Sequence, residues 1–251
     1  YALGNSINIP AVKMLKLNGV SEMIATSSAM GIKTFTEKDR YGLSLTLGGG
    51  EVTMLDMAEG YGVLANGGHR INLHPVLKVV DKNGQILEEY KPLPSPIFGK
   101  KVLPSGVSFI ISDILSDNNA RLMAFGPYSE LSIPGKVVSV KTGTTNDLRD
   151  NWTIGYTPSF LVAVWVGNND NAPMTRLASG ITGAAPIWHD IMAHILKDKP
   201  SEPLQRPSSV IQKRICNLSG LLPPPQGCET RFEYFIKGTE PTKFEEGMRK
   251  V

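Results

Sequence analysis

A lysine, a glycine and three threonines lie together at the end of an alternating, β-branched segment. The segment spans residues 137–145 and ends in Lys141, Thr142, Gly143, Thr144 and Thr145. Its period of two is typical of a β-strand. A cation flanked by short hydroxyl side chains can bind a carboxylate or stabilise a developing oxyanion. Gly143 lets a ligand's backbone approach closely. We therefore expect an anion-binding strand edge here.

A second candidate group lies near the start of the sequence, where Ser6 and Asn8 are separated by one residue. Serine and asparagine are also common in turns and at helix caps, so their types alone favour a structural role. They gain a chemical interpretation only together with a partner such as Lys141. We expect the fold to bring these two groups to one site.

The elements that must position these groups are predicted from apolar periodicity and from Gly, Pro and capping residues. Helices are expected within residues 10–18, 21–30, 53–65, 105–115 and 186–196. Strands are expected at 76–80, 85–90, 137–145, 151–156 and 160–166, and a short strand or extended segment is expected at 43–47. Asn83-Gly84 between two apolar runs predicts a hairpin. The three last strands have short connections, which indicates an antiparallel sheet covered by the helix at 186–196.

Composition excludes several classes of function. The chain has 251 residues, 41% of them hydrophobic, and a formal net charge of +3. It has no block of basic residues, so no nucleic-acid partner is expected. His189 and His194 are five positions apart, whereas a zinc pair on one helical face needs four, so no metal site is predicted. No P-loop sequence is present, and no cofactor is expected.

The last part of the chain is rich in proline, glycine and charge, and it contains both cysteines. Prolines at 200, 203 and 207 mark a linker. We predict one domain over residues 1–199 and a small appendage over residues 200–251. Cys216 and Cys228 enclose a Pro/Gly-rich loop, which favours a disulfide and an oxidising compartment, with two free thiols as the alternative.

The longer sequence context resembles a known family. Ser6-x-Asn8 and the later Lys141-Thr142-Gly143-Thr144 match, in this order, two of the three motifs of penicillin-binding proteins and serine β-lactamases. The flanking residues closely resemble the transpeptidase domain of class A (bifunctional) penicillin-binding proteins. These flanking segments are 48–53, 65–68, 149–158, 164–168, 183–188 and the tail segments 216–228 and 235–242.

The resemblance implies a fold and a reaction. The fold would be α/β of the α+β type, the penicillin-binding or serine β-lactamase fold, with an antiparallel sheet of about five strands and helices on both faces. The reaction would be D,D-transpeptidation on peptidoglycan stem peptides ending in D-Ala-D-Ala. A serine is acylated, and an acceptor amine then resolves the acyl-enzyme to form a cross-link. β-Lactam antibiotics would bind the same site.

The resemblance also implies a role for each site residue. Ser6 would relay a proton to the leaving amine, and Asn8 would hold the substrate amide. Lys141 would supply positive potential. Thr142 and Thr144 would bind the terminal carboxylate, with Gly143 and Thr145 beside them, and the Thr144 N–H would donate to the oxyanion.

The third family motif, Ser-x-x-Lys, is absent, because no serine here has a lysine three positions later. In the family this motif precedes Ser-x-Asn, so we expect a chain that is incomplete at its N-terminus and inactive alone. The family also implies a membrane anchor and a glycosyltransferase domain upstream, at the extracytoplasmic face of the bacterial cell membrane. The alternatives are a D,D-carboxypeptidase or β-lactamase of the same fold, or a non-catalytic wall-binding or scaffold module.

Overall fold

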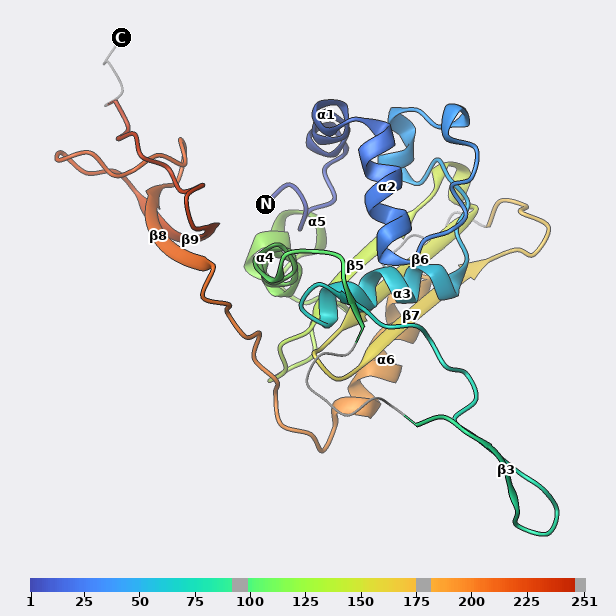
Figure 1. The fold of residues 1–251 in the computed structure, drawn as a ribbon. Coiled ribbons are helices and arrows are strands. Elements are labelled where there is room, and N and C mark those ends of the chain that lie inside the picture. The colour runs from blue at the N-terminus through green and yellow to red at the C-terminus, as the bar shows by residue number, and fades with distance from the viewer. Residues whose placement is uncertain (92–98, 175–181, 247–251) are drawn as a thin grey trace.

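The computed structural model describes residues 1–91, 99–174 and 182–246 (Figure 1). Its α-helices are α1 (Asn8–Asn18), α2 (Val20–Met30), α3 (Met54–Ala65), α4 (Ser105–Ser116), α5 (Leu122–Phe125) and α6 (Ala184–Leu196). Its 3₁₀ helices are η1 (Lys38–Arg40), η2 (Leu43–Leu47), η3 (Asn119–Arg121) and η4 (Asn146–Leu148). The five predicted long helices are therefore present.

The central sheet has three antiparallel strands in the order β5-β6-β7, where β5 is Ser139–Thr144, β6 is Asp150–Tyr156 and β7 is Leu161–Gly167. The mixed helix and sheet fold is confirmed, but the expectation of about five strands in one sheet is not met in the described residues. The other strands pair outside this sheet, because each finds its hydrogen-bonding partner in a separate two-stranded ladder. They are β1 (His69–Arg70) with β4 (Lys100–Lys101), β2 (Lys78–Val80) with β3 (Ile86–Glu89), and β8 (Val210–Cys216) with β9 (Thr230–Ile236).

The β2–β3 hairpin confirms the turn predicted at Asn83-Gly84. The Asp81 carboxylate accepts hydrogen bonds from the N–H groups of Asn83 and Gln85, both 2.8 Å long, which close the turn. Gly84 has a φ of 84°, a left-handed conformation that glycine adopts without strain. The hairpin projects away from the body of the molecule (Figure 1).

Helix α6 covers one face of the sheet, as predicted. Trp188 and Met192 of α6 are completely buried and face valines of β5 and β7. The buried cluster comprises Leu131, Ile133, Val138, Val140, Val162, Val164, Ala184, Ala185, Trp188, Met192 and Leu196. Burial of a large apolar side chain contributes about 1.5–3 kcal/mol, so this layer anchors β5 firmly.

Helices α3 and α4 cover the opposite face, with α3 in front of the strands and α6 behind them (Figure 1). Tyr156 of β6 packs edge-on against Tyr61 of α3, with 6.2 Å between ring centroids. Its hydroxyl lies 2.9 Å from the Ser112 hydroxyl of α4, and the Ser139 hydroxyl donates to the Ser112 carbonyl at 2.7 Å. A sheet with helices on both faces is therefore confirmed.

The segment Leu43–Leu47 is a 3₁₀ helix, so the strand predicted there is wrong. Its alternation of leucines with small polar residues resembles a strand, but none of the described strands pairs with it. Instead the N–H of Gly48, at a φ of 95°, donates to the Leu45 carbonyl at 3.2 Å and closes the turn. Only Leu45 of its three leucines is buried, in a cluster with Leu15 and Ile24. The segment joins α1 and α2 into one unit.

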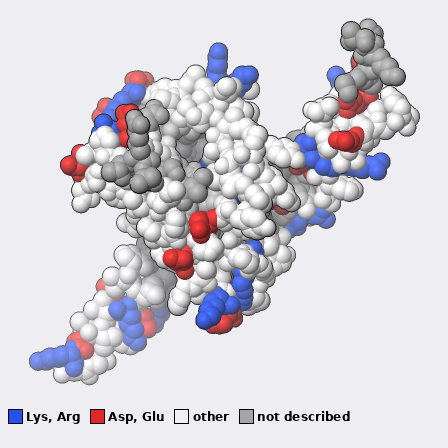
Figure 2. All heavy atoms as spheres, turned by 180° about the vertical axis from the view of Figure 1, so that it is seen from behind, with Lys and Arg blue, Asp and Glu red and all other residues white. Residues whose placement is uncertain are grey.

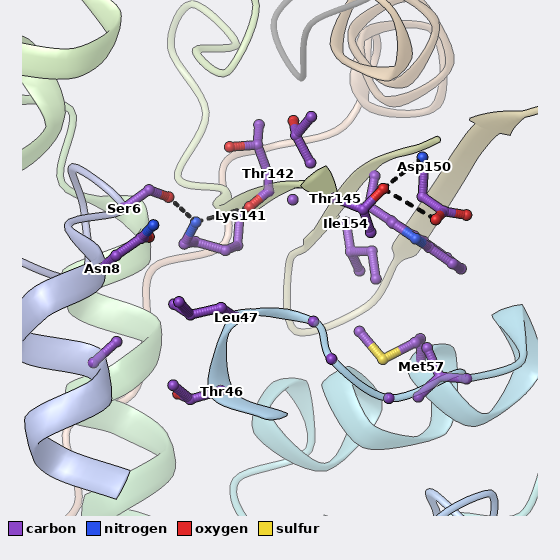
Figure 3. A pocket seen from close by; sticks show the side chains of 18 of the residues that line it. Ser6, Asn8, Thr46, Leu47, Met57, Lys141, Thr142, Thr145, Asp150 and Ile154 are labelled. Carbon is purple, nitrogen blue, oxygen red and sulfur yellow. Dashed lines mark hydrogen bonds between the residues drawn. The ribbon is translucent and has the colours of Figure 1, made fainter. Parts of the chain in front are cut away.

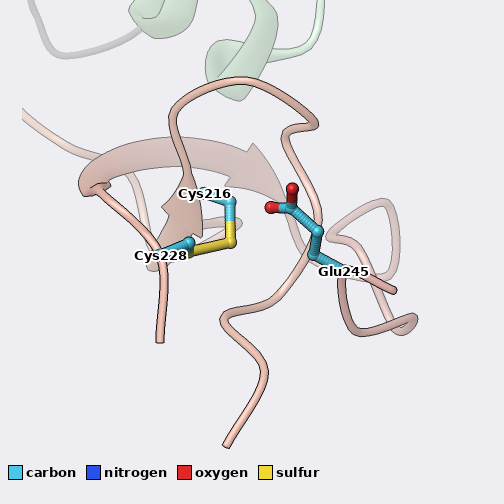
Figure 4. Close-up of side chains that lie close together, drawn as sticks. All are labelled: Cys216, Cys228 and Glu245. Atoms are coloured by element: carbon cyan, nitrogen blue, oxygen red, sulfur yellow. A yellow bond between two sulfur atoms is a disulfide. The ribbon is translucent and has the colours of Figure 1, made fainter. Parts of the chain in front are cut away.

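The appendage is a β8–β9 ribbon that packs on α4. The rings of Phe109 and Tyr234 meet edge-on at 5.2 Å. A Cβ at Gly106 would lie 2.5 Å from Ile236 Cδ1, so glycine allows the ribbon to approach the helix. Cys216 and Cys228 form a disulfide beside Glu245 (Figure 4), which confirms the predicted bridge.

The surface carries charges of both signs. Figure 2 shows Lys and Arg beside Asp and Glu over the body and the appendage on the face that it displays. Among the described helices, none combines the length and the apolar character that a membrane-spanning segment needs.

Candidate functional site

The two sequence motifs meet at a hydrogen bond between Lys141 and Ser6. The Lys141 Nζ donates to the Ser6 Oγ, although the residues are 135 positions apart in the sequence (Figure 3). Nζ also donates to the Thr142 carbonyl at 2.8 Å. Lys141 comes from the edge strand β5, and Ser6 comes from the turn that precedes α1. The fold thus brings together the cation and the hydroxyl that the motifs predicted.

The free edge of β5 faces this pair. The Thr145 N–H donates to the Asp150 carbonyl at 3.1 Å, which places 145 opposite 150 as a hydrogen-bonded pair. Antiparallel pairing alternates, so the main-chain groups of residues 144, 142 and 140 point away from β6. The Thr142 carbonyl, which accepts from Nζ, and the Val140 carbonyl, which accepts from a side chain, agree with this orientation. The Thr144 N–H is therefore aimed at the open edge.

Burial, together with the positive charge of Arg121, lowers the pKa of Lys141 from 10.5 to about 8, and burial is the larger of the two causes. The side chain is partly buried, whereas Ser6 beside it is exposed. At neutral pH the amine remains largely protonated, but its pKa is close enough for proton exchange with a neighbouring group. The pair combines a cation with a hydroxyl open to the cleft.

A cleft of about 1820 Å³ surrounds the pair. Its walls come from the turn before α1, helices α1 and α2, the segment 46–52, and strands β5 and β6. Asn8 lies next to Ser6 and faces Lys141, and Thr46 and Leu47 lie across the cleft (Figure 3). The glycines at 48–50 form the predicted tight turn, and they also line this cleft.

Thr145 lies on the cleft wall with its hydroxyl held by Asp150. The Thr145 Oγ1 donates to one Asp150 oxygen at 3.1 Å and accepts from the Asp150 N–H at 2.8 Å. The other Asp150 oxygen accepts from Trp165 Nε1 at 2.9 Å. Asp150 therefore ties the end of β5 to β6 and β7. A direct role for the Thr145 hydroxyl in substrate binding stays a prediction.

The site also contains Asn5, which the sequence analysis missed. Its Nδ2 donates to the Tyr1 carbonyl at 2.9 Å and to the Ala120 carbonyl at 2.6 Å. Its Oδ1 accepts from the Ala124 N–H at 2.9 Å. An asparagine within Gly4-Asn5-Ser6 carries no local signal beyond turn propensity, because two of these partners, Ala120 and Ala124, lie more than one hundred residues away.

Arg121 was missed as well. This arginine is 3% exposed and donates to the carbonyls of Val140 and Leu115. Within the described residues it forms no ion pair with a carboxylate, and burial lowers its pKa. No sequence pattern marks such a residue, because its partners are main-chain carbonyls.

One group in the described residues has the spacing of metal ligands: Cys216, Cys228 and Glu245. Both sulfurs belong to the disulfide, whereas a metal ligand would be a thiolate. This cluster is therefore structural, and it lies in the appendage, away from the cleft (Figures 1 and 4).

Comparison with known families matches almost the whole chain. Residues 2–193 match the penicillin-binding protein transpeptidase domain, and residues 206–250 match the C-terminal domain of penicillin-binding protein 1A. The penicillin-binding protein 1A of Aquifex aeolicus is 33% identical over 241 residues, covering 96% of this chain and 31% of that protein. A Clostridium botulinum homologue of the same name is 33% identical over 98% of this chain and 29% of its own length. The chain thus spans about a third of these relatives.

Solved structures agree with the family match. The crystal structure of penicillin-binding protein 1A from Haemophilus influenzae superposes with a TM-score of 0.82 at 28% identity, over 98% of this chain and 40% of that one. PonA1 from Mycobacterium tuberculosis gives 0.69 at 27% identity, over 82% of this chain and 57% of that one. A family model that covers residues 2–193, supported by these structures, shows that the chain belongs to the penicillin-binding protein transpeptidase family.

Proposed function

We propose that this chain contributes the proton-relay and carboxylate-binding part of a serine D,D-transpeptidase. The substrate would be a peptidoglycan stem peptide ending in D-Ala-D-Ala, and the product a peptide cross-link in the cell wall. The observation that carries this proposal is the Lys141–Ser6 hydrogen bond at the open edge of β5. The family match makes acyl transfer to and from a serine the expected chemistry.

The acylated serine is proposed to lie outside these 251 residues. No serine here is followed three positions later by a lysine, and the chain spans about a third of its curated relatives. In the first step that serine attacks the carbonyl of the penultimate D-Ala, and the C–N bond to the terminal D-Ala breaks. In the second step an acceptor amine attacks the ester and releases the serine, so the peptide bond lost is replaced by the cross-link.

Ser6 is positioned to deliver a proton to the departing D-Ala amine. Its hydroxyl accepts from Lys141, which leaves its own hydrogen free to point into the cleft. Lys141 can then replace the proton that Ser6 gives away, and its lowered pKa favours that transfer. Asn8, on the same side of the cleft, would hold the substrate amide.

The β5 edge would bind the anionic parts of the substrate. The hydroxyls of Thr142 and Thr144 would donate to the terminal carboxylate near the positive charge of Lys141. Because the Thr144 N–H points to the open edge, it would donate to the tetrahedral oxyanion, and loss of such a donor typically slows acylation by about 10²–10³-fold. Gly143 leaves room for the substrate backbone between the two threonines.

A β-lactam would occupy the same cleft. PonA1, a structural neighbour, is described in complex with penicillin V.

The whole protein is further proposed to carry a glycosyltransferase domain and a membrane anchor and to work at the extracytoplasmic face of the membrane. The disulfide is compatible with that oxidising location. We also propose residues 1–199 as part of the transpeptidase domain and residues 200–251 as its appendage.

The proposal is tested by labelling with a fluorescent penicillin. Residues 1–251 alone should form no covalent adduct, and a label mapped to a serine of this chain would refute the assignment of the nucleophile. In the longer polypeptide that includes Ser-x-x-Lys, labelling should occur and Lys141→Ala should reduce its rate by at least about 10²-fold.

Lys136→Ala is the matched control. The Lys136 amine donates to the Lys199 carbonyl, away from the cleft, so the labelling rate of the variant should equal that of the parent.

Product analysis with a stem peptide and an acceptor amine separates the alternatives. Cross-linked product supports the transpeptidase, whereas release of D-Ala without a cross-link indicates a carboxypeptidase. Hydrolysis of the penicillin itself indicates a β-lactamase.

A further inference from the structure

The turn that carries Ser6 is held in a conformation that it would not favour alone. Ser6 has a φ of 55°, in the left-handed region that non-glycine residues seldom adopt. Its side chain is exposed, so packing around Ser6 itself does not hold it in place. Some neighbouring group must therefore fix the turn, because the Ser6 hydroxyl has to meet Lys141.

Asn5 supplies that fixation. It is 7% exposed, and both atoms of its side-chain amide are used. One atom binds the Ala120 carbonyl, and the other accepts from the Ala124 N–H. The turn and this segment also touch at Gly4, where a Cβ would lie 3.1 Å from the Ala120 oxygen. The Ser6 turn is thus docked on residues 119–124.

The same segment is tied to the lysine strand by Arg121. Its Nη1 donates to the carbonyl of Val140, the residue immediately before Lys141, at 3.4 Å. Its Nη2 donates to the Leu115 carbonyl at the end of α4. A buried guanidinium held by two main-chain carbonyls has little freedom to move. The contacts therefore close a ring that runs from Ser6 through Asn5, the segment 119–124 and β5 back to Lys141.

We propose that Asn5 and Arg121 are positioning residues, which together hold the Ser6 hydroxyl against the Lys141 amine by way of the segment 119–124. This inference rests on the proposed role of the Ser6–Lys141 pair. It adds that the pair depends on two buried residues outside the motifs. Arg121 acts in a second way, since its positive charge is the one that affects the Lys141 amine.

The proposal is tested on the 251-residue chain by following the protonation of Lys141. The probe is the ¹³Cε resonance of labelled lysine in an NMR pH titration, assigned by its loss in Lys141→Arg. In the parent protein, the Lys141 amine should titrate with a midpoint near pH 8. The charge that acts on the amine is that of Arg121, and the carboxylates on the walls of the cleft are Glu22, Glu51 and Asp150. None of the variants below changes those three carboxylates.

Asn5→Ala should move the midpoint upward, toward the ordinary lysine value of 10.5, because a released Ser6 turn leaves the amine more hydrated. Gly4→Ala should move it in the same direction by less, since its Cβ pushes the turn away from Ala120 without removing a hydrogen bond. Asn118→Ala is the matched control. That asparagine borders the same segment but binds Ser132, so the midpoint should stay at the parental value.

Arg121→Met should also raise the midpoint, because it removes a nearby positive charge. Arg121→Lys keeps the charge but lacks the two spaced amino groups that bind both carbonyls, so its shift should be smaller. An unchanged midpoint in folded Asn5→Ala and Gly4→Ala, or an equal shift in Asn118→Ala, would overturn the proposal. If Asn5→Ala does not fold, Gly4→Ala decides alone. The titration needs neither substrate nor nucleophile, so its failure is distinct from failure of penicillin labelling.

Discussion

The indole ring of Trp188 lies directly against the main chain of Gly155. A Cβ at position 155 would stand 2.3 Å from Trp188 Cζ2, which is closer than any real side chain tolerates. Trp188 is completely buried, and Gly155 is opposite Val140 on the neighbouring strand. The contact therefore sets the distance between α6 and the sheet immediately beside the residue that precedes Lys141.

Gly155→Ala is expected to destabilise the protein by about 1–3 kcal/mol, because the added methyl group overpacks a rigid core. Urea denaturation followed by circular dichroism measures the loss. Gly62→Ala is the matched control: its added Cβ would meet no neighbouring segment within 4 Å, and it lies inside α3. That change should stabilise the protein by about 0.5–1 kcal/mol. If the two substitutions changed the free energy of unfolding equally, overpacking against Trp188 would not be the cause.

The ionisation of Lys141 should make stability depend on pH in a defined window. Its folded pKa is about 8, below the value of 10.5 for an unburied lysine. Between these values the unfolded chain binds more protons than the folded one, so the free energy of unfolding rises with pH. For one titrating group, the free energy of unfolding can rise by at most about 1.4 kcal/mol per pH unit. Other charges and hydration keep the rise below this limit.

Comparing the parent with Lys141→Met isolates this effect, because all other titrating groups cancel. The parent should gain stability relative to the variant as the pH rises from 8 toward 10.5, and the difference should be constant below pH 7. Urea denaturation at a series of pH values measures the free energy of unfolding of the parent and of the variant. If the difference in the free energy of unfolding did not change with pH, burial would not lower the pKa of Lys141.

Much of the site could be predicted from residue types and order. The strand edge at Lys141 combines an alternating run with a cation and hydroxyls, and Ser6-x-Asn8 precedes it as the family pattern requires. The hairpin at Asn83-Gly84 and the helix over Trp188 follow from local turn chemistry and apolar spacing. These features depend on interactions within a few residues, which sequence patterns record.

The remaining features depend on contacts between distant segments. The leucines of Leu43–Leu47 alternate as in a strand, but whether a strand forms depends on a partner that the segment itself does not specify. Arg121 binds main-chain carbonyls, and these are the same for every residue type, so no complementary residue marks the site. Asn5 resembles any turn asparagine until the fold brings Ala120 beside it.

Asp150 is expected to couple energetically to Trp165. One carboxylate oxygen accepts from the indole N–H, and the other accepts from the Thr145 hydroxyl. Asp150→Ala should cost about 1–3 kcal/mol, since it leaves two polar partners unsatisfied. A double-mutant cycle with Trp165→Phe should show a coupling of about 0.5–3 kcal/mol. Additive losses would mean that this hydrogen bond does not hold β7 to the end of β5.

The disulfide is expected to stabilise the appendage rather than the cleft. It closes a segment with a sequence separation of 12, and loops of this size contribute about 3 kcal/mol in the chain-entropy account. Reduction should therefore expose the β8–β9 ribbon to protease, and fragments should begin within residues 200–251. The body should remain protected, because its main buried cluster includes no residue of the ribbon, which contacts the body at Gly106 and Phe109 of α4 and at the ring of Tyr1.

The Lys141 titration reports separately on the cleft and should have the same midpoint before and after reduction. The variant with both cysteines changed to serine is the control, since a reducing agent should not alter its digestion pattern. A shift of the Lys141 midpoint on reduction would show that the ribbon acts on the site. The route would be α4, because the carbonyl of Leu115 at its end binds Arg121, which also binds the Val140 carbonyl of β5. A constant midpoint would assign the ribbon a role separate from the chemistry of the cleft.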